Sequence, residues 1–375
     1  MRHQPKMLNF IFGESSIDPY WIADMDFEIA EPISKELSRI AERGRYAYEF
    51  DGESVLSAIS HWYQHRHNLT LNKAQFVQVP GVLTGLALIV RELTNEGDGI
   101  IIQTPVYHQF KKIISSAGRK VITSPLLIKD GKYKIDFDDL AEKFALDNVN
   151  TMIFCNPHNP VGRVWTEEEL TTLIALANKH GVTIISDEIH SDIIYSGHSF
   201  NSIIQHDDNK HVALLGSPAK TFGMQSISNG YIYTENEEVL EKLLSVTDSM
   251  YLGHGNAFTT FATIAAYQHG EAWLDELLTY LENTVSWVES FVADNLPGVK
   301  LYPVEGTYQI WLNFTDTGLS AEKVKSKLVE AKMGLTPGSW FGDGSELFWR
   351  MNIATPLVNI QNSFEQLKEA LKIPD

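Results

Sequence analysis

The segment from Thr151 to Ser186 reads as a strand, a helix and a second strand, and this pattern constrains the fold more than any other part of the sequence. The apolar run TMIFC predicts the first strand, and Thr166 with Glu169 predicts a capping box at the start of the helix. Gly181 predicts the end of the helix, and VTIIS predicts the second strand. Strands joined through a helix run parallel in one sheet, so we expect an α/β fold with helices on both faces.

Similar patterns flank this unit on both sides. Three further apolar runs predict strands, and one segment with apolar residues at helical spacing predicts a helix. The strands are expected at residues 76–79, 100–103 and 211–216, and the helix is expected at residues 82–93. This alternation indicates a mostly parallel sheet.

The pattern changes after about residue 284, where a long amphipathic helix is expected. Beyond it the sequence predicts a strand, a helix, a second strand and a last helix, the first three of them at residues 307–314, 321–332 and 347–354. We therefore expect a large domain over residues 45–284 and a smaller α+β domain built from residues 1–44 and 285–375. Small-molecule sites usually lie in the cleft between two such domains.

Charge and cysteine content exclude several classes of protein. The formal net charge of −18 argues against nucleic-acid binding, which needs a cationic surface to neutralise phosphates. Cys155 is the only cysteine, so no disulfide can form within the chain. No segment has the roughly 20 apolar residues of a membrane span, and residues 1–16 lack the apolar core of a signal peptide. We expect a cytoplasmic protein that binds neither membranes nor nucleic acid.

Lys220 is the strongest candidate for a catalytic residue. It lies in the run SPAKT, directly after the strand predicted at residues 211–216. Most lysines are solvated surface charges, but a cluster of small residues at the end of a buried parallel strand is where α/β proteins bind ligands. We therefore interpret Lys220 as a lysine that forms a Schiff base.

A Schiff-base lysine that carries pyridoxal phosphate needs an acid at the pyridine nitrogen and a cation for the substrate carboxylate. Asp187 directly follows the buried run VTIIS, where an unpaired carboxylate is costly, so a cationic partner such as the pyridine N–H is expected. The alternative for Asp187 is a helix N-cap. Arg350 lies within the apolar strand LFWRMNIA, where a substrate carboxylate could be its anionic partner. The alternative for Arg350 is a structural salt bridge.

Two weaker signals complete the predicted cofactor site. The turn from Gly81 to Thr84 joins a strand to a helix, so its backbone N–H groups could bind phosphate. Tyr107 follows the next strand and could stack on the cofactor ring. Taken alone, each has an ordinary explanation, because such turns often carry glycine and a tyrosine can be half-buried at the start of a helix.

Other chemistries find less support in the sequence. His61 and His65 lie four residues apart on a predicted helix with His67 nearby, which is a metal-like spacing. No glutamate follows His61 as a zinc protease would require, so we expect a polar helix face and no metal site. The sequence contains neither a GxxxxGK[ST] nucleotide loop nor a GxSxG nucleophile motif.

Taken in order, these segments resemble one family. The chain resembles the fold-type I pyridoxal-phosphate enzymes of the aminotransferase class I/II superfamily, and within it the MalY/PatB-like cystathionine β-lyases, which are C–S lyases. The resemblance covers residues from about 20 to 354, and NPHNPVGRVW with SDEIH is its most specific part. The other matching blocks are YWIADMDF, YAY, TPVYHQF, SPAKTF, AAYQHGEAWLDEL, VEGTYQIWLNF and FWRMNIA.

The resemblance implies a large domain with a mostly parallel seven-stranded sheet, together with a smaller α+β domain. It implies that Lys220 binds the cofactor and acts as the base at Cα, that Asp187 meets the pyridine nitrogen, and that Tyr107 stacks on the ring. Further cofactor contacts are implied for Val82, Leu83, Asn159, His190 and Ser217.

The resemblance also implies how the substrate and a second subunit are bound. Arg350 would hold the substrate carboxylate, and Ala23 and Tyr107 would line the substrate pocket. Tyr48 would reach the phosphate of the partner subunit's cofactor, so the active unit would be a homodimer with active sites at the interface.

The expected activity is β-elimination by a C–S lyase, with an aminotransferase as the alternative and a non-catalytic regulator on the same fold as a third possibility. The intact lysine, aspartate and arginine argue against a loss of catalysis. Two departures from the family pattern concern the substrate: Gly223 to Ser226 after Phe222, and Leu357 after Pro356.

Overall fold

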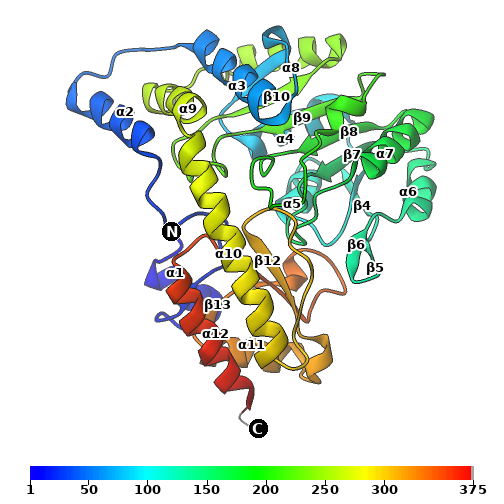
Figure 1. Cartoon of the computed structure of the whole chain (residues 1–375). Coiled ribbons are helices and arrows are strands. Elements are labelled where there is room, and N and C mark those ends of the chain that lie inside the picture. Colours follow the sequence, from blue (N-terminus) through cyan, green and yellow to red (C-terminus); the bar gives the residue numbers. More distant parts are fainter. Residues whose placement is uncertain (373–375) are drawn as a thin grey trace.

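The computed structural model describes residues 1–372 and contains one large sheet and one smaller sheet (Figure 1). The large sheet has seven strands in the order β2, β10, β9, β8, β7, β3, β4. β10 pairs antiparallel with both of its neighbours, and the other pairs are parallel, which confirms the expected mostly parallel sheet. The strands are β2 Phe76–Val79, β3 Gly99–Ile102, β4 Lys120–Thr123, β7 Val149–Cys155, β8 Thr183–Asp187, β9 Val212–Gly216 and β10 Gly230–Thr234.

Helices cover both faces of the large sheet, because successive side chains of a strand point to opposite faces. In β3, Ile100 and Ile102 pack in the cluster that contains α4, α5 and α8, whereas Ile101 packs in the cluster that contains α6 and α7. On the β2–β10–β9 side, α3 and α9 continue the second layer. The helices are α3 Gly52–His67, α4 Val82–Leu93, α5 Gln109–Ser116, α6 Phe137–Phe144, α7 Glu167–His180, α8 Glu237–Ser249 and α9 Ala257–His269.

The predicted strand–helix–strand unit is confirmed. Thr166 accepts a hydrogen bond from the Glu169 backbone at 3.2 Å, and the Glu169 carboxylate accepts one from the Thr166 backbone at 2.9 Å. Gly181 ends α7 with a left-handed φ of 66°. The following strand is shifted by one residue from the prediction and includes Asp187 as its last residue. This shift places the carboxylate at the C-terminal edge of the sheet.

The smaller sheet has four antiparallel strands in the order β11, β12, β15, β14. Its strands are β11 Lys300–Leu301, β12 Gln309–Asn313, β14 Thr336–Pro337 and β15 Phe348–Asn352. Near it lie α1 Pro5–Phe12, α11 Ala321–Glu330, α12 Leu357–Lys372 and the parallel pair β1 Asp18–Pro19 with β13 Met333–Gly334. The described chain also contains the hairpin of β5 Leu127–Lys129 with β6 Lys132–Lys134. Four short 3₁₀ helices lie at Lys73–Gln75, Ile203–His206, Thr315–Thr317 and Gly338–Trp340.

Two helices connect the parts that the sequence assigned to separate domains. α10, Glu271–Asn295, runs without a break through residue 284, from the region of α9 to the smaller sheet (Figure 1). α2, Glu31–Glu42, packs against α9 of the large sheet's helical layer. The boundaries at residues 44 and 284 therefore stay a prediction. Among residues 1–372, no helix combines the length and the apolar composition that crossing a membrane requires.

Candidate active site

A cavity of about 490 Å³ lies between the C-terminal edge of the large sheet and the strands β14 and β15. The C-terminal edge of a parallel sheet is the usual ligand site of α/β proteins. All of the predicted site residues except Tyr48 line this cavity. They are Ala23, Val82, Leu83, Tyr107, Asn159, Asp187, His190, Ser217, Lys220 and Arg350.

Lys220 lies in the turn after β9, with its side chain in the cavity. Its Nζ donates to the main-chain oxygen of Ala23 at 2.5 Å. Burial, together with the positive charge of Arg350, lowers the pKa of the Lys220 amine to about 8. An amine with such a pKa is partly unprotonated near neutral pH, so it can act as a nucleophile and as a base.

Asp187 is a buried carboxylate with little compensation for its charge. Its Oδ1 accepts one hydrogen bond, from the backbone N–H of Ile189 at 3.2 Å, and no residue in 1–372 forms an ion pair with it. Burial raises the pKa of the carboxyl group to about 6. No helix of the described chain begins at Asp187, so it is not a helix N-cap. A ligand that places an N–H⁺ group beside Asp187 would supply the missing partner.

Arg350 is a buried cation without a carboxylate partner in residues 1–372. Its Nη2 donates to the main-chain oxygen of Trp21 at 2.8 Å, and its Nη1 donates to Asn159 Oδ1 at 3.2 Å. Its guanidinium also lies over the ring of Phe341, 5.0 Å from the centroid, and among the described residues its Nε has no hydrogen-bond partner. Because burial without an anion is unfavourable, the pKa of the guanidinium is lowered to about 10. These contacts fit the binding of an anionic ligand and not a structural salt bridge.

The start of α4 forms one wall of the cavity and can bind an anion. Gly81 precedes Val82 as the N-cap and offers no side-chain oxygen, so the first backbone N–H groups of the helix have no side-chain cap. Only glycine fits at the neighbouring position 230, because a Cβ on Gly230 would lie 2.8 Å from Gly81 C and Val82 N. Ser217 lines the same cavity and donates to the main-chain oxygen of Asn229 at 2.8 Å. A phosphate group fits this wall.

Tyr107, Asn159 and His190 supply the remaining polar atoms of the predicted cofactor site. Burial raises the pKa of the Tyr107 hydroxyl and lowers that of His190 well below its usual range, so both side chains are neutral. His190 packs edge-on against Tyr308, and its Nδ1 has no hydrogen-bond partner in the described part of the chain. Since Asn159 Oδ1 accepts from Arg350, its amide NH₂ is left to donate.

Tyr48 does not lie in the cavity of its own chain. It is 93 % exposed and stacks on Phe50 with ring centroids 6.1 Å apart. The family resemblance implied a contact of Tyr48 with the partner subunit's cofactor, and this role stays a prediction.

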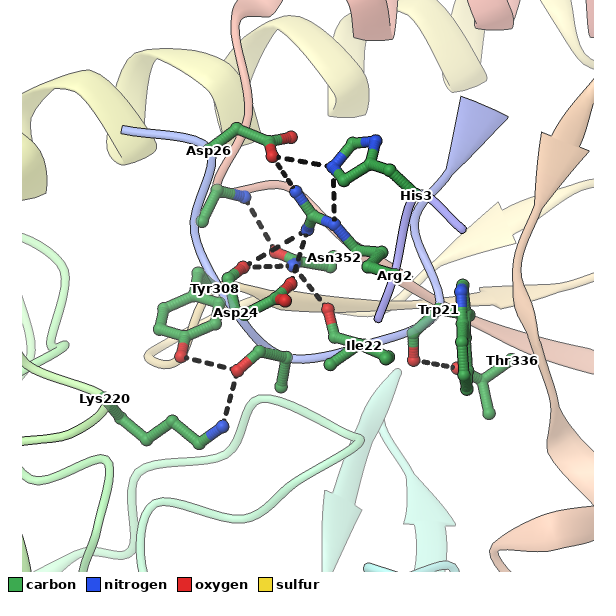
Figure 2. Close-up of polar contacts among 12 residues, drawn as sticks. Arg2, His3, Trp21, Ile22, Asp24, Asp26, Lys220, Tyr308, Thr336 and Asn352 are labelled. Atoms are coloured by element: carbon green, nitrogen blue, oxygen red, sulfur yellow. Dashed lines mark hydrogen bonds and ion pairs between the residues drawn. The ribbon is translucent and has the colours of Figure 1, made fainter. Parts of the chain in front are cut away.

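Several lining residues were not identified from the sequence. Trp21 and Thr336 contact Arg350. Tyr308, which is not among the residues that line the cavity, donates from its hydroxyl to the Ala23 oxygen at 3.2 Å (Figure 2). Gln225, from the segment that departs from the family pattern, also lines the cavity. The block YWIADMDF was recognised, but only Ala23 was assigned a role. Any residue type can accept a hydrogen bond through its main-chain oxygen, so such contacts cannot be predicted from the residue type.

Comparison with known proteins assigns the chain to a family of enzymes. Residues 33–367 match the aminotransferase class I and II family, so the chain belongs to that family. Its relatives include cystathionine β-lyases: it is 37% identical to PatB of Bacillus subtilis over 96% of this chain and 94% of that protein. Protein MalY of Escherichia coli is 28% identical over 96% of this chain and 93% of that protein. The resemblance seen in the sequence is thereby confirmed.

A solved structure supports the same assignment. Cystalysin from Treponema denticola, whose crystal structure contains pyridoxal 5′-phosphate, aligns with a TM-score of 0.92 at 30% identity, over 98% of this chain and 95% of that chain. Aspartate aminotransferases are more distant, at 24% identity. Asp187, which forms no ion pair within residues 1–372, the start of α4 and the amine of Lys220 fit the pyridine nitrogen, the phosphate and the aldehyde of such a cofactor, in that order.

Proposed function

We propose that this chain binds pyridoxal phosphate and cleaves the Cβ–S bond of an L-cysteine-type S-conjugate, giving pyruvate, ammonia and a thiol. One observation carries the proposal: Lys220, Asp187 and Arg350 line the same cavity, and none of them forms an ion pair within residues 1–372. Uncompensated charges of both signs in one cavity indicate a ligand that carries charges of both signs. An amino acid bound beside a pyridinium ring meets this requirement.

Each residue has a defined task in this reaction. Arg350 binds the α-carboxylate of the substrate and so fixes the position of Cα. Bound pyridoxal phosphate supplies an electron sink that stabilises negative charge at Cα. Asp187 would hold a positive charge on the pyridine nitrogen, and Tyr107 would contact the ring. Lys220 removes the proton from Cα, which its pKa of about 8 allows near neutral pH. The Cβ–S bond then breaks, the thiolate leaves with the electron pair, and the released 2-aminoacrylate hydrolyses to pyruvate and ammonia.

The lyase is favoured over an aminotransferase by the comparisons. The chain is 37% identical to a cystathionine β-lyase and 24% identical to aspartate aminotransferases. Both reactions use the same lysine, aspartate and arginine, so these three residues do not separate the two activities.

The proposal includes a homodimer with shared sites. Tyr46, Tyr48 and Phe50 are exposed aromatic residues, and residues 46–50 with 255–258 line a surface hollow outside the active-site cavity. Exposed aromatic clusters are typical of protein interfaces. Tyr48 would bind the phosphate in the partner's cavity. A cytoplasmic location also belongs to the proposal, because the single buried Cys155 calls for no oxidising compartment.

A product assay tests the proposed activity. The purified protein, supplied with pyridoxal phosphate, is incubated with L-cystathionine or L-cysteine and no 2-oxo acid, and pyruvate and thiol or sulfide are measured. We expect pyruvate and the sulfur product in equal amounts, and none from Lys220→Ala. Turnover that requires a 2-oxo acid and releases no sulfur product would instead support the aminotransferase.

A further inference from the structure

Arg2 is a buried cation outside the active-site cavity, with 2 % of its surface exposed. Its Nη1 lies 2.8 Å from Asp24 Oδ1, and its Nη2 forms an ion pair with Asp26. His3 Nε2 also contacts Asp26 Oδ1, at 3.1 Å. Figure 2 shows the guanidinium of Arg2 between the two carboxylates. Arg2 therefore joins two carboxylates of one short stretch of chain.

That stretch, residues 21–26, runs along β15 and is held there through its main chain. Asn352 Nδ2 donates to the oxygens of Ile22 and Asp24, each at 2.6 Å. The backbone N–H of Asp26 donates to the oxygen of Ala354 at 3.0 Å. These bonds fix the backbone, and within residues 1–372 only Arg2 and His3 form ion pairs with the two carboxylates.

The same stretch carries two oxygens that contact catalytic side chains. The oxygen of Trp21 accepts from Arg350 at 2.8 Å. The oxygen of Ala23 accepts from Lys220 at 2.5 Å (Figure 2). In the sequence, Ala23 therefore lies between Trp21, which accepts from Arg350, and Asp24, which pairs with Arg2. A shift of residues 21–26 would move both active-site contacts together.

We propose that Arg2 is a positioning residue for the reaction: by pairing with Asp24 and Asp26 it fixes the main-chain oxygens of Trp21 and Ala23 that orient Arg350 and Lys220. Without Arg2, the two carboxylates would repel each other, and the Asp24 charge would act on Lys220 unopposed. The activity part of this proposal rests on the proposed function, whereas the conformational part does not.

The electrostatic part has a defined sign. The charged and titratable groups that face Lys220 are Asp24, Asp187, Arg350 and His190. Arg350 and burial lower the pKa of Lys220, and the two carboxylates raise it. The positive charge of Arg2 opposes the field of Asp24 at Lys220, so removing Arg2 makes the potential at Lys220 more negative. The pKa of Lys220 is therefore expected to rise.

The test compares Arg2→Gln with Arg39→Gln, which removes an exposed arginine paired with Glu36 on α2, away from the cavity. Three quantities are measured: hydrogen–deuterium exchange of the peptide that contains residues 21–26, the pH dependence of trinitrobenzenesulfonate labelling at Lys220 in the cofactor-free protein, and kcat/KM. For Arg2→Gln we expect exchange roughly tenfold faster, a labelling curve shifted to higher pH, and kcat/KM lower by roughly tenfold. Arg2→Lys should recover part of each change because it restores one charge.

The outcomes separate the proposal from a merely structural role. The proposal is wrong if Arg2→Gln exchanges faster but has the same labelling curve and the same kcat/KM as the Arg39→Gln control. It is also wrong if exchange in Arg2→Gln is unchanged. If Arg2→Gln fails to fold, Asp26→Asn tests the conformational part, because it removes one ion pair of Arg2 while its backbone N–H still bonds to Ala354. Faster exchange and a lower kcat/KM are expected for Asp26→Asn, without a shift of the labelling curve to higher pH, because Arg2 still pairs with Asp24; unchanged exchange in this variant would overturn the proposal. An enzyme without lyase activity would sink the proposed function but leave the exchange and labelling results to decide on Arg2.

Discussion

Replacing Arg350 with lysine is expected to impair substrate capture while leaving the fold intact. Arginine can donate two parallel hydrogen bonds to a carboxylate, and lysine offers a single point charge. A hydrogen bond to a charged group contributes about 1.5–3 kcal/mol, and about 1.4 kcal/mol corresponds to a factor of ten. Losing one such bond should lower kcat/KM by roughly 10- to 150-fold, mostly through a higher KM.

The matched control is Arg163→Lys, which changes another buried arginine. Arg163 pairs with Glu305 at 2.7 Å and Glu169 at 2.9 Å, so its charge is already satisfied within the protein. Arg163→Lys should lower the thermal stability and leave the KM unchanged, whereas Arg350→Lys should raise the KM and leave the thermal stability unchanged. The assay is steady-state kinetics with varied amino acid, combined with thermal unfolding of each variant. If Arg350→Lys keeps the wild-type kcat/KM, the reasoning that its partner is the substrate carboxylate is wrong.

Three further predictions concern the cofactor residues and the dimer. Borohydride reduction of the protein with pyridoxal phosphate should label Lys220, and a label on another lysine in peptide mapping would refute this assignment. Asp187→Asn should raise the free energy of unfolding of the cofactor-free protein at pH 7 by up to about 3 kcal/mol, because burial of the charge raises the carboxyl pKa from 3.8 to about 6; denaturant unfolding measures this change. The same variant should have strongly reduced turnover. Normal turnover would show that Asp187 has no catalytic role. Mixing inactive Lys220→Ala with an impaired Tyr48→Phe protein should restore activity if Tyr48 acts across the interface, and no recovery despite demonstrated subunit exchange would contradict that.

The pKa shifts also predict how the stability of the cofactor-free protein depends on pH. Lys220 has a folded-state pKa of about 8, below its usual 10.5, so the unfolded chain binds more protons between these values and stability rises with pH across this window. Asp187 has a folded-state pKa of about 6, above 3.8, so the folded chain binds more protons between those values and stability falls with rising pH there. Comparing wild type with Lys220→Met and Asp187→Asn isolates each contribution. Parallel stability curves for a variant and wild type would contradict the corresponding shift.

Features set by neighbouring residues could be predicted from the sequence. The capping box at Thr166 and the stop at Gly181 depend on local contacts, and both are found where expected. Arg350 could be predicted as a buried cation because it interrupts an apolar strand. Its main-chain partner Trp21 could not, because it lies 329 residues away and offers only a carbonyl oxygen.

Long-range packing accounts for what the sequence did not predict. β10 was not assigned as a strand, although its residues Gly230–Thr234 are buried between β2 and β9. α10 begins at Glu271, so the change of pattern near residue 284 falls inside one continuous helix and not at the start of a helix. Arg2 gave no signal either, since an arginine near the N-terminus is ordinarily exposed and its burial depends on Asp24 and Asp26.

The fate of the substrate's amino group tests the central claim most directly. L-Cysteine labelled with ¹⁵N at the amino group is incubated with the purified enzyme and pyridoxal phosphate, without a 2-oxo acid, and ¹⁵N-ammonium and pyruvate are followed by NMR over many turnovers. A C–S β-lyase should release ¹⁵N-ammonium, pyruvate and sulfide in a ratio of about one to one to one, because the nitrogen leaves with the carbon fragment. If the label instead stays on the protein-bound cofactor after one turnover and leaves only when a 2-oxo acid is added, the chain is an aminotransferase and the proposed β-elimination is wrong.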